Sequence, residues 1–117
     1  MTNGPPTGVG TLPDDALVVR GGRNGPDDIR RAMATHPSGV TGISVMSAPA
    51  LPATELASWL PHGRIGVTTV EAVRAAGGDV IPTSGWSPYH ATLTGLTAEE
   101  VSRLLTPTVS NPARSSL

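Results

Sequence analysis

Residues 89–94, Tyr-His-Ala-Thr-Leu-Thr, decide the fold that this sequence predicts, because polar and apolar side chains alternate through them. In an extended strand, alternate side chains point to opposite faces of the sheet. The polar side chains of His90, Thr92 and Thr94 are therefore predicted to stand together on one face. The opposite, apolar face is predicted to carry Tyr89, Ala91 and Leu93. This strand thus offers both a contribution to the core and a candidate site.

Outward from this strand, short strand-like and helix-like segments alternate along the chain. Runs rich in Val, Ile and Leu predict strands, and apolar residues at helical spacing predict helices. The predicted strands are residues 16–20, 40–46, 64–67, 79–83 and 89–94. The predicted helices are residues 26–35, 53–60, 69–76 and 97–105. This order, β-α-β-α-β-α-β-β-α, predicts an α+β fold in which short helices pack against one small mixed sheet.

Several residues mark the ends and edges of these elements. Residues 68–71 (Thr-Thr-Val-Glu) and 97–100 (Thr-Ala-Glu-Glu) read as capping boxes that start the last two helices. Gly77 is predicted to end the first of these helices in the left-handed conformation. Gly42 inside a strand indicates a bulge or a close approach of two backbones, and Pro82 favours an edge strand. The last two predicted strands, joined by a short loop, are expected to pair antiparallel.

The two ends of the chain offer little to bury. Residues 1–13 are polar and rich in Gly and Pro, and residues 106–117 are polar and interrupted by Pro. Such composition is typical of flexible tails. We therefore predict one globular domain over residues 14–105, flanked by a flexible tail on each side.

Composition excludes some classes of partner. The net charge is −1 and the sequence pI is about 6.2, which argues against strong non-specific binding to DNA. A nucleotide or a single RNA site stays compatible with this charge. All 8 basic residues other than histidine are Arg, a bias typical of GC-rich coding sequences such as those of actinobacteria.

The chain has no Cys, so disulfides, thiolate metal sites and cysteine nucleophiles are excluded. Its 3 His residues are scattered along the sequence, so we expect no metal centre, and no motif indicates a resident cofactor. No apolar run approaches the roughly 20 residues of a membrane span, and the first residues do not resemble a signal peptide. These observations predict a soluble cytoplasmic protein without a membrane partner.

Residues 90–101 begin with His90-Ala91-Thr92-Leu93, a His-x-Thr pattern on a strand that leads into a turn and a helix. Histidine is the side chain best suited to exchange protons near neutral pH. The stretch resembles one half of the two-histidine phosphoesterases, a family that carries two such motifs where this chain carries one. The resemblance implies an acid/base role for His90 and a phosphate contact for Thr92. A solvated strand face explains the same residues without a site.

A second candidate follows the first predicted strand, where Arg20 and Arg23 flank two glycines. An Arg at a strand end beside glycines can bind a phosphate with its guanidinium and with free backbone N–H groups. The predicted helix over residues 26–35 begins just after, which adds positive potential to the same neighbourhood. A tight strand exit with a solvated Arg is the alternative.

Strand-borne Arg20 is followed by strand-borne Ser44 in the segment Gly-Ile-Ser-Val. This order is similar to the opening of the Arg-Ser-Glu ADP-ribosyltransferases. The resemblance implies that Arg20 holds a dinucleotide and that Ser44 supports the pocket. The late strands of this chain carry no Glu at the position of that family's catalytic residue, which leaves His90 as the candidate for that role.

Two aromatic residues are candidates for stacking on a base or a nicotinamide ring. They are Trp86, in the loop Ser-Gly-Trp-Ser-Pro, and Tyr89. A loop aromatic folded onto the edge of the core is the simpler alternative for Trp86.

Three function classes follow from these candidates. The first is a small, metal-independent, phosphate-directed enzyme, such as an RNA-cleaving toxin-like module, with His90, Arg20 and Thr92 as catalytic residues. Its substrate-binding residues would be Arg23, Ser44, Trp86 and Tyr89. The second is an ADP-ribosyltransferase-like protein that uses NAD or another nucleotide through Arg20 and Ser44. The third is a non-enzymatic interaction module whose cognate protein partner covers an exposed strand edge.

Overall fold

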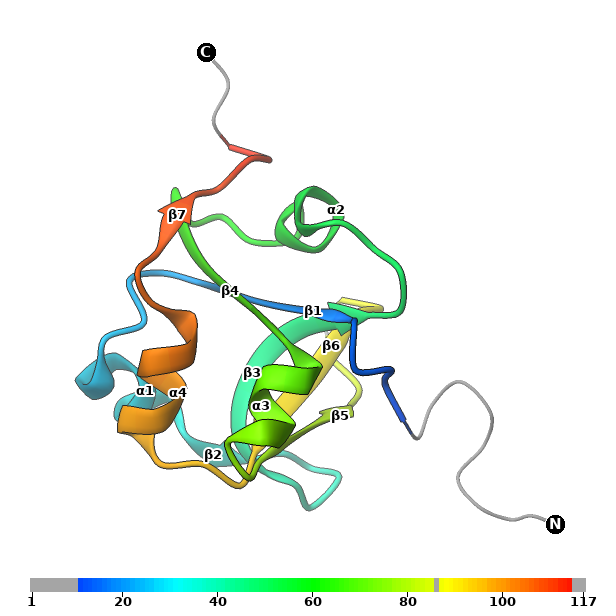
Figure 1. Cartoon of the computed structure of the whole chain (residues 1–117), viewed down its shortest axis with the longest axis vertical. Coiled ribbons are helices and arrows are strands. Elements are labelled where there is room, and N and C mark those ends of the chain that lie inside the picture. The colour runs from blue at the N-terminus through cyan, green and yellow to red at the C-terminus, as the bar shows by residue number, and fades with distance from the viewer. Residues whose placement is uncertain (1–10, 86, 115–117) are drawn as a thin grey trace, which may run out of the picture.

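The computed structural model describes residues 11–85 and 87–114, and within these ranges seven strands form one sheet (Figure 1). The strand order is β5-β6-β3-β1-β4-β7, and β2 pairs with β3. The strands are β1 (Leu17–Gly21), β2 (Ala34–Thr35), β3 (Thr41–Ala48), β4 (Arg64–Thr69), β5 (Asp79–Pro82), β6 (His90–Thr94) and β7 (Val109–Ser110). The helices are α1 (Pro26–Ala32), α2 (Ala53–Ala57), α3 (Val70–Ala75) and α4 (Ala98–Leu105). The predicted α+β class is confirmed.

All strand pairings in the described part of the chain are antiparallel, where a mixed sheet was predicted. The reason is the β2–β3 hairpin, which was not predicted. It turns the chain back after α1, so β3 enters the sheet opposite in direction to β1. The predicted antiparallel pairing of β5 with β6 is confirmed. β5 is an edge strand, as Pro82 predicted.

The two faces of the sheet are covered differently. Helices α1, α3 and α4 pack on one face, which we call the three-helix face, and the short α2 packs on the other (Figure 1). The larger core lies under the three helices and includes Val18, Ile43, Val45, Ala91 and Leu93. The smaller core lies under α2 and includes Val19, Met46, Leu56, Leu60 and Ile65. Helix α2 is only five residues long, so it covers only part of this face of the sheet.

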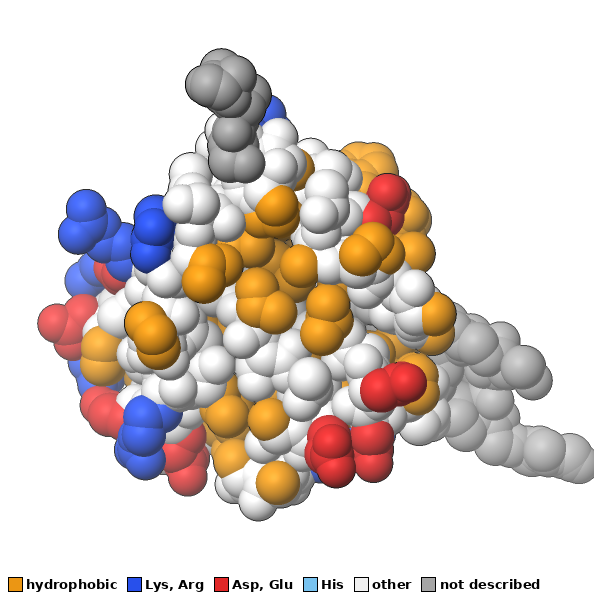
Figure 2. All heavy atoms as spheres, turned by 45° about the horizontal axis from the view of Figure 1, so that its top comes forward, with side chains coloured by type: hydrophobic (Ala, Val, Ile, Leu, Met, Phe, Trp, Pro, Cys, Tyr) orange, Lys and Arg blue, Asp and Glu red, His pale blue; other side chains and the backbone are white. Residues whose placement is uncertain are grey.

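Charged and apolar side chains are separated on the surface. Ion pairs join Arg30 to Asp27 and to Glu99, so they tie α1 to α4. Figure 2 shows charged side chains gathered toward the edges of one view and hydrophobic side chains in its middle. Trp59, which follows α2, and Val109 in β7 are the large hydrophobic residues that stay exposed among the described residues.

Local sequence signals set most helix ends. Thr97 and Glu100 form the predicted capping box, with both reciprocal hydrogen bonds present. Gly77 follows α3 with a φ of 104°, as predicted for a left-handed stop. The cap of α3 is Thr69, whose hydroxyl accepts from the Ala72 N–H, so the helix starts one residue later than the predicted box.

Two predicted elements end early because tertiary pairing takes their residues. The helix predicted over 26–35 stops at Ala32, since Ala34 and Thr35 pair with β3 instead. The strand predicted over 89–94 starts at His90, because Tyr89 lies in the preceding turn. Tyr89 therefore packs against the smaller core and not beside Ala91, which corrects the predicted apolar face.

The C-terminal segment packs against the sheet, although residues 106–117 were predicted to be a flexible tail. β7 pairs with Arg64 and Ile65 of β4. Asn111 is fully buried, its side chain donates to the His62 carbonyl at 2.9 Å and its backbone N–H donates to the Gly63 carbonyl at 2.8 Å. No sequence pattern indicated this packing, because the segment has few apolar residues and is held in place by hydrogen bonds.

At the other end, Leu12 is 4% exposed and belongs to the larger core, so the packed domain begins before residue 14. Residues 1–10 and 115–117 of the two predicted tails lie outside the described residues.

Candidate functional site

The sheet opens between its two central strands. β1 pairs with β3 from Leu17 to Val19, and the last matched pair is Val19 with Met46. Beyond that point β1 continues along β4 and β3 continues along β6. The strands therefore diverge, and a wedge-shaped gap separates Arg20 from the middle of β3.

One residue of β3 faces this gap with its backbone. Gly42 pairs with β2 and Met46 pairs with β1 along the same edge of β3, which leaves Ile43, Ser44 and Val45 between them. Backbone groups in an antiparallel strand point alternately to its two neighbours. Because the alternate residues Gly42 and Met46 point to this edge, the N–H and C=O of Ser44 do so as well. On this edge of β3, the backbone of Ser44 therefore faces the gap between the part paired with β2 and the part paired with β1.

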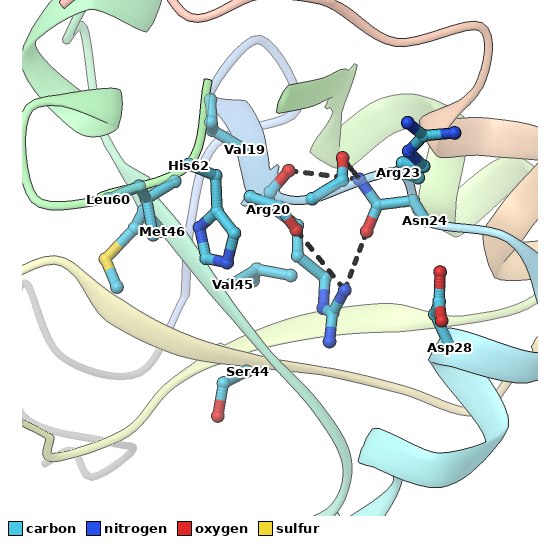
Figure 3. Close-up of a pocket in the computed structure, with 12 residues that line it drawn as sticks. Val19, Arg20, Arg23, Asn24, Asp28, Ser44, Val45, Met46, Leu60 and His62 are labelled. Atoms are coloured by element: carbon cyan, nitrogen blue, oxygen red, sulfur yellow. Dashed lines mark hydrogen bonds between the residues drawn. The ribbon is translucent and has the colours of Figure 1, made fainter. Parts of the chain in front are cut away.

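A pocket of about 350 Å³ fills the gap (Figure 3). Its walls come from the end of β1, the turn that follows, the middle of β3, and the segment after α2. The lining residues are Val19, Arg20, Gly21, Gly22, Arg23, Asn24, Asp28, Ser44, Val45, Met46, Leu60 and His62. The structure thus brings three of the predicted candidates, Arg20, Arg23 and Ser44, to one pocket.

Arg20 is the less exposed of the two arginines that line this pocket. It alternates with Val19 along β1, so its side chain leaves the sheet on the three-helix face, toward α1. It is half-buried, and no carboxylate of the described residues forms an ion pair with it. Desolvation lowers the pKa of Arg20, and the charge of nearby Asp28 partly opposes this. A desolvated guanidinium without an ion pair favours an anionic ligand.

Asn24 holds Arg20 in place. Its side-chain oxygen accepts from Arg20 Nη1 at 2.7 Å, and its side-chain amide donates to the carbonyls of Arg20 at 3.1 Å and Gly22 at 3.2 Å. Asn24 is fully buried, and its φ of 58° is a left-handed conformation that Asn tolerates better than most residues. The Ser102 hydroxyl on α4 donates to the Asn24 carbonyl at 2.7 Å. The orientation of the Arg20 side chain is therefore fixed by a buried residue that is itself hydrogen-bonded to α4.

His62 lies on the opposite wall of the pocket, over the backbone of Gly21 (Figure 3). A Cβ at residue 21 would lie 2.0 Å from His62 Nδ1, so only glycine allows this approach. The predicted glycine pair therefore admits a ring beside the pocket. Arg23 also lines the pocket, and its side chain is exposed.

On the α2 side of the sheet, Ser44 meets His90. The matched pairs Met46–His90 and Ser44–Thr92 place these four side chains on one face, as the alternation of β6 predicted. Ser44 Oγ lies 3.0 Å from His90 Nε2, and Thr83 Oγ1 lies 2.9 Å from His90 Nδ1. His90 is only 7% exposed, whereas Ser44 is exposed. The contact therefore joins an exposed serine to a buried imidazole ring.

Thr92, the predicted phosphate contact, is buried beside Thr83. It is 3% exposed, and its hydroxyl lies 3.0 Å from the hydroxyl of Thr83. A second, smaller cavity of about 70 Å³ touches both Thr92 and Ser44. Thr92 thus extends the hydrogen-bonded series Ser44–His90–Thr83. The Arg20 side chain, in contrast, leaves the opposite face of the sheet.

The two remaining predicted candidates do not line the pocket. Tyr89 packs edge-on to Trp59 with ring centroids 6.3 Å apart, and its hydroxyl donates to Glu55 at 3.3 Å. Desolvation and the neighbouring Glu55 carboxylate raise the pKa of Tyr89. Tyr89 therefore belongs to the α2 contact. Trp86 lies outside the described residues.

Sequence reasoning missed Asn24, His62, Thr83 and His36. The His36 ring lies 5.6 Å from that of His90, and its Nε2 donates to the Ser84 carbonyl at 2.6 Å. Only Asn24 carried a usable signal, because an Asn just after two glycines and an Arg is typical of a left-handed turn. The other three reach the site through chain reversals that sequence spacing does not report.

Within the described ranges, no group of three or more His, Asp or Glu side chains is placed to hold a metal ion. None of the helices described is both long enough and apolar enough to cross a membrane. No family model, curated protein or solved structure matches this chain.

Proposed function

We propose that the chain binds a phosphate-containing nucleotide in the gap between β1 and β3 and uses it as a transferase, with NAD as the first candidate. The observation that carries this proposal is the meeting of Arg20 and Ser44 in one pocket. These two residues are the ones that the similarity to Arg-Ser-Glu ADP-ribosyltransferases implies for dinucleotide binding. The proposed place of action is the cytoplasm, where NAD is available.

Charge supports an anionic ligand at Arg20. Transfer of the guanidinium out of water is unfavourable unless a partner compensates it. Asn24 supplies one neutral acceptor to Nη1, and the Asp28 carboxylate lies near enough to act on the guanidinium charge but forms no ion pair with it in the described part of the chain. A pyrophosphate would supply the missing negative charge and accept charge-assisted hydrogen bonds from the guanidinium.

The size and lining of the pocket support a nucleotide. Its volume of about 350 Å³ falls at the lower end of small-molecule sites, which span about 300–1,000 Å³. The lining combines Arg20, Asn24 and His62 with the apolar side chains of Val45 and Leu60. His90, which does not line the pocket but contacts its lining residue Ser44, is the proposed acid/base residue where that family uses Glu.

Ligand-dependent melting of the purified protein tests this proposal. We expect millimolar NAD to raise the melting temperature of the wild type, since a ligand that binds only the folded state stabilises it. Arg20→Gln should weaken NAD binding by about tenfold or more, the value of a charge-assisted hydrogen bond. Arg103→Gln is the matched control, because Arg103 is exposed on α4 and away from the pocket. An equal shift in both variants, or no shift in the wild type, would contradict the proposal.

The Ser44–His90 contact favours a second candidate function, metal-independent cleavage of an RNA phosphodiester. In that case His90 is the acid/base residue, and a substrate hydroxyl takes the place of the Ser44 hydroxyl beside Nε2. The test is the cleavage of labelled RNA in the presence of a chelator by the wild type and by His90→Gln. Cleavage that the variant retains would argue against a role for His90.

A further inference from the structure

We infer that Ser44 is an activated nucleophile that attacks electrophilic phosphorus. The inference stands on side-chain geometry and does not depend on which nucleotide the pocket binds. It assigns to Ser44 a covalent step that goes beyond the supporting role implied by the resemblance. Three observations carry it: the contacts of the two His90 ring nitrogens, the exposure of Ser44, and the presence of Arg20 in the same pocket.

The contacts of His90 are compatible with a proton on Nδ1. This nitrogen lies 2.9 Å from the Thr83 hydroxyl, which can donate or accept, and 3.3 Å from the Thr83 carbonyl oxygen, which only accepts. In the state that we infer, Nδ1 carries the proton and Nε2 accepts from the Ser44 hydroxyl at 3.0 Å. This is the arrangement of a nucleophile, a base and a group that orients the base.

Burial strengthens this arrangement. The His90 ring is enclosed, so its orientation is held by Thr83 on one side and by Ser44 on the other. Thr83 is held in turn by its contact with Thr92. Ser44 is the exposed residue of this hydrogen-bonded set, and so the one most open to a substrate. A nucleophile needs this combination of a fixed base and an open approach.

The pocket also contains a cation for an anionic substrate. Ser44 and Arg20 line the same cavity, but their side chains leave opposite faces of the sheet and the Ser44 hydroxyl points away from Arg20 (Figure 3). Arg20 is therefore placed to bind another anionic group of the substrate, and not the oxygens on the phosphorus that Ser44 attacks. In the step that we infer, Ser44 Oγ forms a bond to phosphorus while the bond from phosphorus to the leaving group breaks. The Oγ proton passes to His90 Nε2 and then to the leaving group, which departs with the bonding electrons.

The second half of the reaction returns the enzyme to its starting state. Water attacks the phosphorus of the phosphoserine, and His90 Nε2 accepts a proton from that water. The Oγ–P bond breaks, and the proton moves from Nε2 to Ser44 Oγ. The step needs no oxidant, reductant or metal ion for its balance.

The chain contains a matched comparison in Ser38 and His36. Ser38 Oγ lies 2.8 Å from His36 Nδ1, and both side chains are accessible. However, the backbone N–H of Ser38 also donates to that nitrogen, at 2.9 Å. The lone pair of Nδ1 is therefore already shared, so His36 is a poorer base for its serine than His90 is for Ser44.

Labelling with diisopropyl fluorophosphate tests the inference. Its phosphorus bonds to a nucleophilic serine as fluoride leaves, and mass spectrometry of peptides locates the adduct. We expect an adduct on Ser44 and none on Ser38 in the wild type. Ser44→Ala should remove the adduct and Ser38→Ala should not change it. His90→Gln should slow labelling by about a hundredfold or more, the usual contribution of a general base.

An unlabelled Ser44 in the folded wild type, or equal rates in the wild type and a folded His90→Gln variant, would overturn the inference. The wild-type result is decisive even if His90→Gln fails to fold, which circular dichroism reveals. The measurement is separate from the NAD experiment. Labelling of Ser44 without NAD binding would contradict the proposed function alone, and NAD binding without labelling would contradict the nucleophile alone.

Discussion

Replacement of Asn24 by alanine tests whether one buried amide holds the pocket arginine in place. The substitution removes an acceptor for Arg20 Nη1 and the donor for two backbone carbonyls, those of Arg20 and Gly22. It also places alanine, which has a Cβ but no polar group to bond the nearby backbone, at a φ of 58°. Alanine therefore loses contacts and adopts an unfavourable backbone conformation at the same position.

The expected loss follows from these contacts. A hydrogen bond contributes about 0.5–1.5 kcal/mol to stability, and one to a charged group about 1.5–3 kcal/mol. The left-handed conformation adds about 1 kcal/mol for a residue other than glycine. Because Asn24 makes two neutral bonds and one to a charged group, we expect a loss of about 3.5–7 kcal/mol in the free energy of unfolding. That is a large share of the roughly 5–15 kcal/mol typical of a small domain.

Urea unfolding followed by circular dichroism measures this loss. Asn24→Gly separates its two sources, since glycine removes the contacts but adopts positive φ freely and should recover about 1 kcal/mol relative to alanine. Asn24→Asp keeps an acceptor for Arg20 and loses the donor. An alanine variant within about 0.5 kcal/mol of the wild type, the range of ordinary surface substitutions, would refute the reasoning.

Three further predictions concern the fold. Gly42→Ala should destabilise the protein by about 1–3 kcal/mol or more because its Cβ would lie 1.9 Å from a carbonyl oxygen of β6, whereas Gly63→Ala has open space and should be nearly neutral in the same urea assay. Hydrogen bonds from its capping threonine hold the pKa of Glu100 below the usual 4.5, so they stabilise the protein above that pH and are lost as pH falls through the lowered pKa. The urea midpoint of Glu100→Gln should therefore fall less steeply than that of the wild type below about pH 4.5, and parallel curves would contradict this. Absorbance titration of the single tyrosine, Tyr89, should give a midpoint above 10.0 in the folded protein, chiefly through desolvation, and a midpoint at or below 10.0 would contradict its packing.

Short-range signals predicted much of the fold. The capping box at Thr97, the stop at Gly77 and the edge position of Pro82 each depend on groups within a few residues, so the sequence reports them directly. Alternation along β6 likewise placed His90 and Thr92 on one face. These predictions succeed because backbone geometry alone relates neighbouring side chains.

Predictions that depend on long-range pairing were less successful. The end of α1 was wrong because Ala34 and Thr35 gain more from pairing with β3 than from one more helical turn. Asn111 was assigned to a loose tail because its three carbonyl partners lie about fifty residues earlier in the chain. Polar anchors of this kind leave no hydrophobic pattern for a sequence to display.

By itself, the sequence determined the α+β class and most of the elements, and Arg20, Ser44 and His90 were among the seven candidate site residues that it offered. Only the tertiary structure decided how these three meet. It placed Ser44 beside His90, 46 residues away, and placed Arg20 on the opposite face of the sheet. It also opened the gap that joins the two faces at Ser44. The physical reason is that strand order and the point where two strands part depend on the packing of the whole chain, whereas alternation depends only on the local backbone.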